Sequence, residues 1–245
     1  LLGSPRLPID WLALISAVNS TANLEDKHVK TITLGNTTEG ALLRYLAIET
    51  NPKTKIALME DFVSHYPAHI STTWVLSELQ EAYAKAGDRE KAMAAGEKIL
   101  AADPNDVAIA LRNYELADAA KDPDLVRKWA VLASDAARRV LASPKPAGAE
   151  EAAAWQSAAD FSRQVEATCE YALYRLAAQA TTPEQRIALA DLLAARNSQS
   201  SYLAVLRPQL FTAWQQAGNH ARALQMAEEE FRTSANNDDM LLYAA

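Results

Sequence analysis

The side chains of this sequence that could do chemistry are a few histidines, one cysteine and some clustered carboxylates. His65 and His69 lie four residues apart, the spacing of two metal ligands on one face of a helix. Pro67 lies between them and breaks a helix at this point, so we expect no metal site here. Cys169 is the single cysteine, and one thiol can form neither an intrachain disulfide nor a cysteine-based zinc site. We expect it to be a small buried side chain at a helix contact.

The acidic clusters are predicted to be solvated helix surfaces rather than catalytic carboxylates. They are Glu60-Asp61, Glu228-Glu229-Glu230 and Asp238-Asp239. The sequence contains no phosphate-binding glycine loop, no nucleophile elbow and no His-Glu-x-x-His pattern. We therefore predict a protein that is not an enzyme and that uses no cofactor and no metal.

The composition favours helices and a protein partner. Only 7 of the 245 residues are Gly and 49% are hydrophobic, with many alanines, which cost least in a helix. A net charge of −7 argues against a nucleic-acid partner, because binding to phosphates needs a basic face. No apolar run approaches the roughly 18 residues of a membrane span, so we expect none in this chain.

Five helix-breaking pairs, each followed by an amphipathic stretch, divide the chain at a nearly regular period. They are Asn51-Pro52, Gly87-Asp88, Asp122-Pro123, Thr182-Pro183 and Gly218-Asn219. In each pair an Asn, Asp or Thr can cap the first free amides of the following helix. The caps lie 37, 34, 60 and 37 residues apart. A period of 34 to 37 residues is that of a two-helix repeat, and the longest interval holds one repeat with roughly 26 extra residues.

Residues 71–106 show this repeat most clearly. Its key residues are Leu79, Tyr83, Gly87, Ala92 and Pro104. We expect Tyr83 to fill the space between the two helices, Gly87 to permit the tight turn and Ala92 to let the helices approach closely. Pro104 is expected to end the second helix. With these residues at this spacing, the segment resembles a tetratricopeptide repeat.

The resemblance covers about residues 37–142 and 183–240, is strong only in the second and fifth units, and implies an all-α fold. That fold is a right-handed α-solenoid of about five antiparallel helix pairs. Residues 37–142 are predicted to form three pairs, residues 143–148 a proline-rich loop, and residues 149–245 two further pairs. In the last pair Trp214, Gly218 and Ala223 occupy the Tyr, Gly and Ala positions.

Two parts of the chain depart from the repeat pattern. Residues 149–179 contain neither Gly nor Pro, so they form one helix of about 30 residues or two helices with a bend. We interpret them as the extended first helix of the fourth pair, with a protruding helix for dimerisation or docking as the alternative. Residues 1–36 form an irregular N-terminal extension: 9–18 suggest a short helix and 28–34 an extended segment. Residues 236–245 resemble the start of an incomplete final helix.

A stack of such pairs offers a concave face, lined by the first helix of each pair, where a peptide can bind. The residues predicted to line it are Trp74, Ser77, Glu78, Glu81, Ala108, Arg112 and Glu115. Family members that clamp a peptide carboxylate use cations and amides at such positions, whereas this chain has acids at two of them. We therefore expect a mixed, slightly acidic groove, with Trp74 partly exposed as an anchor.

These features predict a scaffold that binds a peptide or a partner subunit. The alternatives are a structural subunit that docks through its terminal segments, and an accessory domain of a larger enzyme or sugar-binding protein. The partner is either a second copy or a different chain. Residues 55–67 and 143–148 also resemble a group of acidobacterial tetratricopeptide proteins. That resemblance implies a periplasmic or extracellular location, with the cytoplasm as the alternative.

Overall fold

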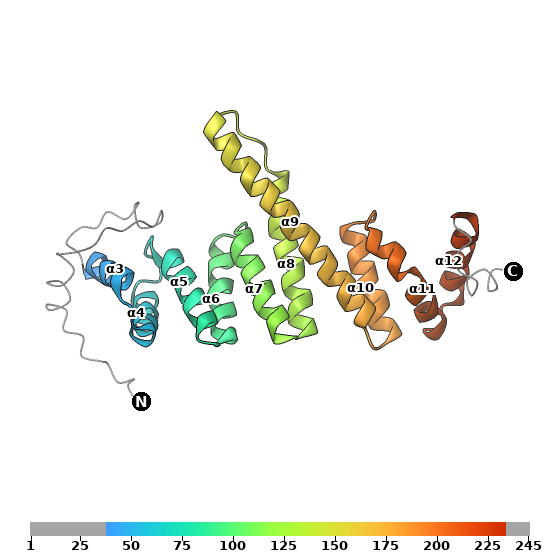
Figure 1. The fold of residues 1–245 in the computed structure, drawn as a ribbon, viewed down its shortest axis with the longest axis horizontal. Coiled ribbons are helices and arrows are strands. Elements are labelled where there is room, and N and C mark those ends of the chain that lie inside the picture. Colours follow the sequence, from blue (N-terminus) through green and yellow to red (C-terminus); the bar gives the residue numbers. More distant parts are fainter. Residues whose placement is uncertain (1–37, 234–245) are drawn as a thin grey trace. The chain divides into compact units, whose positions relative to one another are not determined.

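The computed structural model describes residues 38–233, and this part of the chain is entirely helical (Figure 1). Its ten helices are α3 (Thr38–Ile48), α4 (Pro52–His65), α5 (Thr72–Lys85), α6 (Arg89–Ala102), α7 (Val107–Ala120), α8 (Pro123–Ala142), α9 (Ala149–Gln179), α10 (Pro183–Arg196), α11 (Ser201–Gln216) and α12 (His220–Thr233). No strand occurs within residues 38–233, which confirms the all-α prediction. The predictions for residues 1–36 and 236–245 lie outside the described residues.

The helices belong to two compact units that meet in sequence at Pro104 and Asn105. In unit 1 (described residues 38–104), α3 packs on α4, α4 on α5 and α5 on α6. In unit 2 (described residues 105–233), consecutive helices from α7 to α12 pack on one another, and α9 also contacts α7 and α11. The predicted loop at 143–148 lies inside unit 2, between α8 and α9.

All five predicted helix caps are confirmed. The Asn51 side chain accepts hydrogen bonds from the backbone amides of Lys53 and Thr54, and the Asp122 side chain accepts from those of Asp124 and Leu125. Asp88 accepts from the amide of Lys91, Thr182 from that of Gln185, and Asn219 from that of Arg222. Each bond satisfies an amide that the first helical turn leaves without an intrahelical partner. These local interactions fix where α4, α6, α8, α10 and α12 begin.

The turns before α6 and α12 share one backbone geometry. Gly87 has a φ of 81° and Gly218 a φ of 75°, a left-handed conformation that glycine adopts without steric cost. In both turns the amide that follows the glycine donates back to the preceding helix, to Tyr83 O and Trp214 O respectively. In the turn before α8 the left-handed residue is Lys121, with a φ of 55°. This turn therefore has a left-handed residue directly before the helix cap, as the other two do, although that residue is not glycine.

The two units fill their cores differently. Unit 1 buries large side chains: Leu42, Leu43, Leu46, Met59, Phe62, Trp74, Leu79, Tyr83 and Ile99. In unit 2 the buried side chains of α8 and α9 are mostly small: Ala130, Ala133, Ser134, Ala136, Ala137, Ala159, Ser162, Cys169, Ala172 and Ala177, beside the larger Val126, Trp129, Val165 and Leu173. Small side chains let helix backbones approach closely, so these two helices can form an extensive contact.

Residues 149–179 form the single helix α9 of 31 residues, which confirms the unbent alternative. Within unit 2, its first turns project beyond the neighbouring helices (Figure 1). Among residues 149–158, Ala152 and Trp155 are half-buried and the others are exposed. The Trp155 indole N–H donates to Ser143 Oγ at 3.0 Å, which ties the projecting segment to the 143–148 loop. No described helix is both long and apolar enough to cross a bilayer.

Candidate functional site

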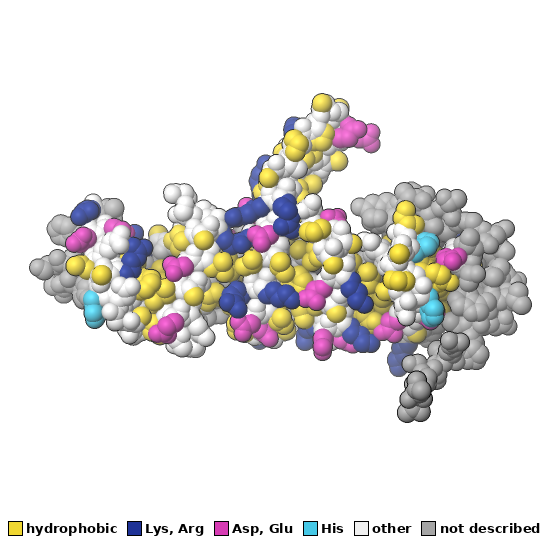
Figure 2. All heavy atoms as spheres, turned by 180° about the vertical axis from the view of Figure 1, so that it is seen from behind, with side chains coloured by type: hydrophobic (Ala, Val, Ile, Leu, Met, Phe, Trp, Pro, Cys, Tyr) yellow, Lys and Arg dark blue, Asp and Glu magenta, His cyan; other side chains and the backbone are white. Residues whose placement is uncertain are grey.

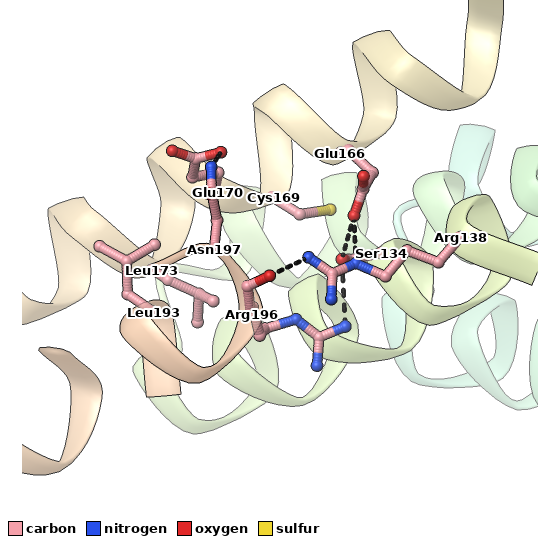
Figure 3. Close-up of a pocket in the computed structure, with 9 residues that line it drawn as sticks. All are labelled: Ser134, Arg138, Glu166, Cys169, Glu170, Leu173, Leu193, Arg196 and Asn197. Atoms are coloured by element: carbon pink, nitrogen blue, oxygen red, sulfur yellow. Dashed lines mark hydrogen bonds and ion pairs between the residues drawn. The ribbon is translucent and has the colours of Figure 1, made fainter. Parts of the chain in front are cut away.

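A polar pocket of about 340 Å³ lies between α8, α9 and α10 in unit 2 (Figure 3). Its lining residues are Ser134, Arg138, Glu166, Cys169, Glu170, Leu173, Leu193, Arg196 and Asn197. Ser134 and Arg138 lie one turn apart on α8, and Glu166, Cys169 and Glu170 lie one turn apart on α9. Helical spacing thus places each set on one face, so that the two helices present charged groups to each other.

The charged groups of this pocket are bound mainly to one another. Arg138 Nε donates to Glu166 Oε1 at 2.5 Å, and its Nη2 donates to the backbone oxygen of Arg196 at 2.6 Å. Arg196 Nη2 donates to Ser134 Oγ at 3.0 Å and pairs with Asp135 Oδ1 at 2.5 Å. Each guanidinium has a carboxylate partner, so the network can hold the end of α10 against α8 and α9.

Two further side chains of this pocket, Glu170 and Cys169, also favour a structural over a catalytic role. Glu170 accepts hydrogen bonds from Asn197 Nδ2 at 3.1 Å and from Ser200 Oγ at 2.5 Å, so its carboxylate is engaged at the turn between α10 and α11. Cys169 is fully buried, as predicted, and burial raises the pKa of its thiol to about 12. A thiol with such a pKa stays protonated at neutral pH, which disfavours a nucleophilic role.

A second hollow, of about 490 Å³, is more apolar and lies where α8 begins, α9 ends and α10 begins. Its lining residues are Pro123, Asp124, Arg127, Leu176, Gln179, Ala180, Thr181, Gln185, Ala188, Leu189 and Leu192. Asp124 and Arg127 pair with each other at 3.1 Å. The hollow therefore offers leucine and alanine side chains beside a neutralised pair, and no group suited to acid–base chemistry.

Three tyrosines form an aromatic surface on α9 and α11. Tyr171 is 47% exposed, while Tyr174 and Tyr202 are half-buried. The rings of Tyr174 and Tyr202 are stacked with centroids 4.7 Å apart, and Tyr171 lies 6.0 Å from Tyr174 and 5.9 Å from Tyr202. One turn further along α9, Arg175 forms an ion pair with Asp118 of α7. This ion pair links α9 to α7 next to the tyrosine surface, which is defined by the rings of Tyr171, Tyr174 and Tyr202.

On α5 in unit 1, the predicted groove residues are only partly available. The prediction that Trp74 is partly exposed is wrong: the side chain is buried, with 8% of its surface exposed, and Thr72, Val75 and Leu76 at the start of α5 are buried as well. The Glu78 carboxylate pairs with Lys55 Nζ at 3.1 Å, and Glu81 pairs with Lys85. The remaining predicted residue of this helix, Ser77, is half-buried.

On α7 in unit 2, the predicted groove residues share one face at i, i+4 and i+7. Ala108 and Glu115 are exposed and Arg112 is half-buried. Asp118 follows Glu115 by three residues, and its ion pair with Arg175 links this face to α9. The structure thus places the helix that carries the α7 part of the predicted groove next to α9, the helix that carries Tyr171 and Tyr174.

The remaining candidate groups show no site for a metal or an unpaired basic cluster. Helix α4 ends at His65, and no group of three metal-binding side chains occurs among the described residues. Lys and Arg side chains gather where the projecting part of α9 meets the rest of unit 2 (Figure 2). Elsewhere on α8 and at its end, three basic side chains have partners: Arg127 pairs with Asp124, Arg139 donates to Asn105 at 2.8 Å, and Lys128 lies over the Trp129 ring.

Sequence reasoning missed the tyrosine surface. Tyr171 and Tyr174 are three residues apart and can be assigned to one side of a helix from spacing alone. Tyr202 is distant in sequence and belongs to another helix, so its stacking on Tyr174 depends on the register of α11 against α9. No model of a known protein family matches this chain, and no curated protein is significantly similar to it.

Proposed function

We propose that this chain is a non-enzymatic interaction protein whose helices form a tetratricopeptide-like right-handed solenoid. The order of the helices and the packing of consecutive helices within each unit support the repeat. Contacts of α9 with α7 and α11 also support it, because the first helices of neighbouring pairs lie beside one another in such a stack. The shared turn geometry at Gly87 and Gly218 supports the equivalence of the second and fifth pairs.

The binding face in this proposal is the side of α7, α9 and α11 that carries the tyrosine surface. The observation that carries the proposal is the cluster of the exposed Tyr171 with the half-buried Tyr174 and Tyr202. Tyrosine supplies large contact area at low cost in side-chain entropy, and it is enriched at protein interfaces. The charged groups around it are largely paired with one another, which favours binding over catalysis. Residues 108, 112 and 115 of α7 extend the same face.

The test is site-specific photo-crosslinking in extracts of the source organism. A benzophenone amino acid replaces Tyr171 in one variant and Leu132 in the other. Leu132 is a matched control because it is 40% exposed and lies on α8. We expect a discrete cross-linked partner from position 171 and none from position 132. Equal products from both positions, or none from position 171, would contradict a binding face at α7, α9 and α11.

A structural subunit of a larger assembly is the second candidate, and the projecting start of α9 favours it. Ala154, Ala158 and Phe161 lie on the face of α9 that is buried further along the helix, yet in this part they are exposed. Acidic side chains lie at the tip, where the first turn carries Glu150 and Glu151 (Figure 2). Cross-links from position 154 that persist when position 171 gives none would favour this candidate. In both candidates we expect a periplasmic or extracellular protein.

A further inference from the structure

The projecting start of α9 continues a stripe of side chains that is buried further along the same helix. Val165 and Ala172 of this stripe are buried. Counting back from Val165 in steps of four and three residues leads to Phe161, Ala158 and Ala154, which are exposed. A stripe with this spacing is the kind that packs against a second helix. The part from Ala154 to Phe161 is therefore an apolar helix face that unit 2 leaves uncovered.

The length of α7 explains why this face is uncovered. Helices α7 and α9 both run antiparallel to α8, and Asp118 of α7 pairs with Arg175 of α9 (Figure 1). Helix α7 begins at Val107, eleven residues before Asp118, and the residue eleven before Arg175 is Gln164. Because the rise per residue is the same in both helices, α7 begins about level with Gln164 and does not cover the part of α9 before it. The uncovered stretch, residues 149–161, is about 20 Å long.

The sizes of the side chains on this face are complementary to a second copy of the same face in the antiparallel direction. When two copies meet at a two-fold axis near residue 156, Ala154 of each copy lies against Ala158 of the other. Small side chains then meet at the centre, where they let the helices approach closely. Phe161 of each copy lies beside Glu151 of the other, so its ring can pack on the methylene groups of that side chain.

The charges on the projecting segment disfavour a parallel pair. Residues 143–161 contain three acidic side chains and one basic side chain, Lys145. Two of the acidic side chains, Glu150 and Glu151, are exposed in the first turn of α9. A parallel pair would bring these carboxylates of both copies together at the tip, where like charges repel one another.

The antiparallel direction instead brings opposite charges together. The acidic tip of each copy then lies beside the base of the other copy's projecting segment, where Lys and Arg side chains gather (Figure 2). Arg139 lies at that level, because its Nε donates to Asn105 Oδ1 at 2.8 Å and Asn105 directly precedes the cap of α7. The charge distribution of the segment is therefore complementary to that of a second copy.

We propose that two copies of this chain form an antiparallel two-fold dimer through residues 150–161 of α9. This inference rests on the second candidate function, because it names the partner of the projecting surface, and it does not depend on the tyrosine surface. The interface consists of one short helix segment from each copy. Such a small interface predicts a reversible dimer with a dissociation constant in the micromolar range.

The first experiment measures the mass of the purified full chain by sedimentation velocity, at concentrations from about 5 to 500 µM. The seam variant is Ala154→Arg with Ala158→Arg, and the control variant is Ala153→Arg with Ala167→Arg. All four alanines are exposed on α9, but Ala153 and Ala167 lie on another face of the helix. Arginine is a good helix former, and circular dichroism with thermal unfolding establishes that both variants are folded.

We expect the unmodified chain and the control variant to pass from monomer to dimer with dissociation constants that agree within about twofold. The seam variant should dimerise at least about tenfold more weakly, because guanidinium groups of both copies would meet at the centre of the interface.

A second experiment determines the direction of pairing. Two single-cysteine chains, Ala154→Cys and Ala158→Cys, are oxidised separately and as an equal mixture. Cys169 is fully buried and does not take part. An antiparallel pair places position 154 against position 158 of the other copy, so we expect a covalent dimer mainly from the mixture. A parallel pair would place like positions together and give covalent dimers from each chain alone.

Three outcomes would overturn the proposed dimer: a chain that stays monomeric throughout, a seam variant that dimerises like the control, or covalent dimers mainly between like positions. If the purified chain is monomeric while position 154 cross-links to a different protein in extracts, the second copy is the wrong partner and the second candidate function stands. If position 154 gives no cross-link in extracts either, both are wrong. Cross-links from Tyr171 test the tyrosine surface separately.

Discussion

The two units of this chain pack their helices with different kinds of side chain. Unit 1 separates its helices with large apolar residues, and its polar contacts between helices, such as Glu60 with Lys91, lie near the surface. Unit 2 buries mainly alanines on α8 and α9 and holds α10 with a partly buried arginine network. Closely spaced helices with small side chains and partly buried ion pairs between them require a particular register. That register also positions the tyrosine surface.

The largest expected effect is the loss of a bulky core residue in unit 1. Phe62 is fully buried and packs against the rings of Tyr66 and His69, with centroids 5.2 and 5.5 Å away. We expect Phe62→Ala to lower the free energy of unfolding by about 4 kcal/mol, because it leaves a cavity among large neighbours. Native-state hydrogen exchange should show the loss of protection in α4 and α5. An equal loss in α8 to α10 would show that the units do not unfold separately.

In unit 2 the corresponding prediction concerns the charged side chain of Arg196 rather than an apolar ring. The Arg196 side chain is 14% exposed and bonds to Val131 O, Ser134 Oγ and Asp135 Oδ1. We expect Arg196→Met to cost about 3 kcal/mol in urea unfolding, since it leaves buried acceptors without their donor. The control is Arg163→Met, which removes an exposed pair with Asp160.

The control should change the free energy of unfolding by less than about 0.5 kcal/mol, because the Arg163 pair is screened by solvent. If Arg196→Met is equally mild, the network does not stabilise the fold, and the contrast between the units is wrong in that respect.

Enlarging a small residue of α8 tests whether the packing of unit 2 requires small side chains. Ala133 of α8 is fully buried, and we expect Ala133→Leu to destabilise the protein by about 2 kcal/mol because the closely spaced helices must move apart. Its neighbour Leu132 is 40% exposed, so Leu132→Ala serves as the control and should be nearly neutral. The test is the midpoint of urea unfolding at an unchanged slope. A stable Ala133→Leu variant would mean that the interface has unfilled space.

Local features of this chain could be predicted from the sequence, and contacts between distant residues could not. The caps at Asn51, Asp88 and Thr182 were predictable because each acts on amides two or three residues away. Trp74 was assigned wrongly, because its burial depends on how wide a face of α5 the neighbouring helices cover. The stacking of Tyr202 on Tyr174 depends on the register of α11 against α9, which helical periodicity within one segment does not specify.

A smaller effect is expected from substitutions in two turns, one in each unit. Gly87→Ala places a side chain in the left-handed region and should cost about 1 kcal/mol, although no atom lies within 4 Å of the new Cβ. Lys121 already occupies that region in the turn before α8, so Lys121→Gly should stabilise the protein by about 0.5 kcal/mol. Thermal unfolding midpoints of the two variants should move in opposite directions. A shift in the same direction would show that backbone conformation is not what distinguishes these turns.

The smallest effect concerns the exposed polar contacts of unit 1 and depends on pH. The Tyr83 hydroxyl donates to Glu60 at 2.5 Å, and this hydrogen bond, together with Lys91, lowers the pKa of the Glu60 carboxyl. A lowered pKa in the folded state means that the contribution is present above the carboxyl's ordinary pKa and is lost as the pH falls below it. Glu60→Gln should therefore destabilise the protein at pH 7 by about 0.5 kcal/mol or less, given the exposure of the pair, and the difference should shrink between about pH 5 and pH 3. Tyr83→Phe keeps the ring and removes the donor, so it should flatten the same pH dependence. A difference between Glu60→Gln and the unmodified chain that stays constant across this range would show that the carboxyl is not stabilised by its contact with Tyr83.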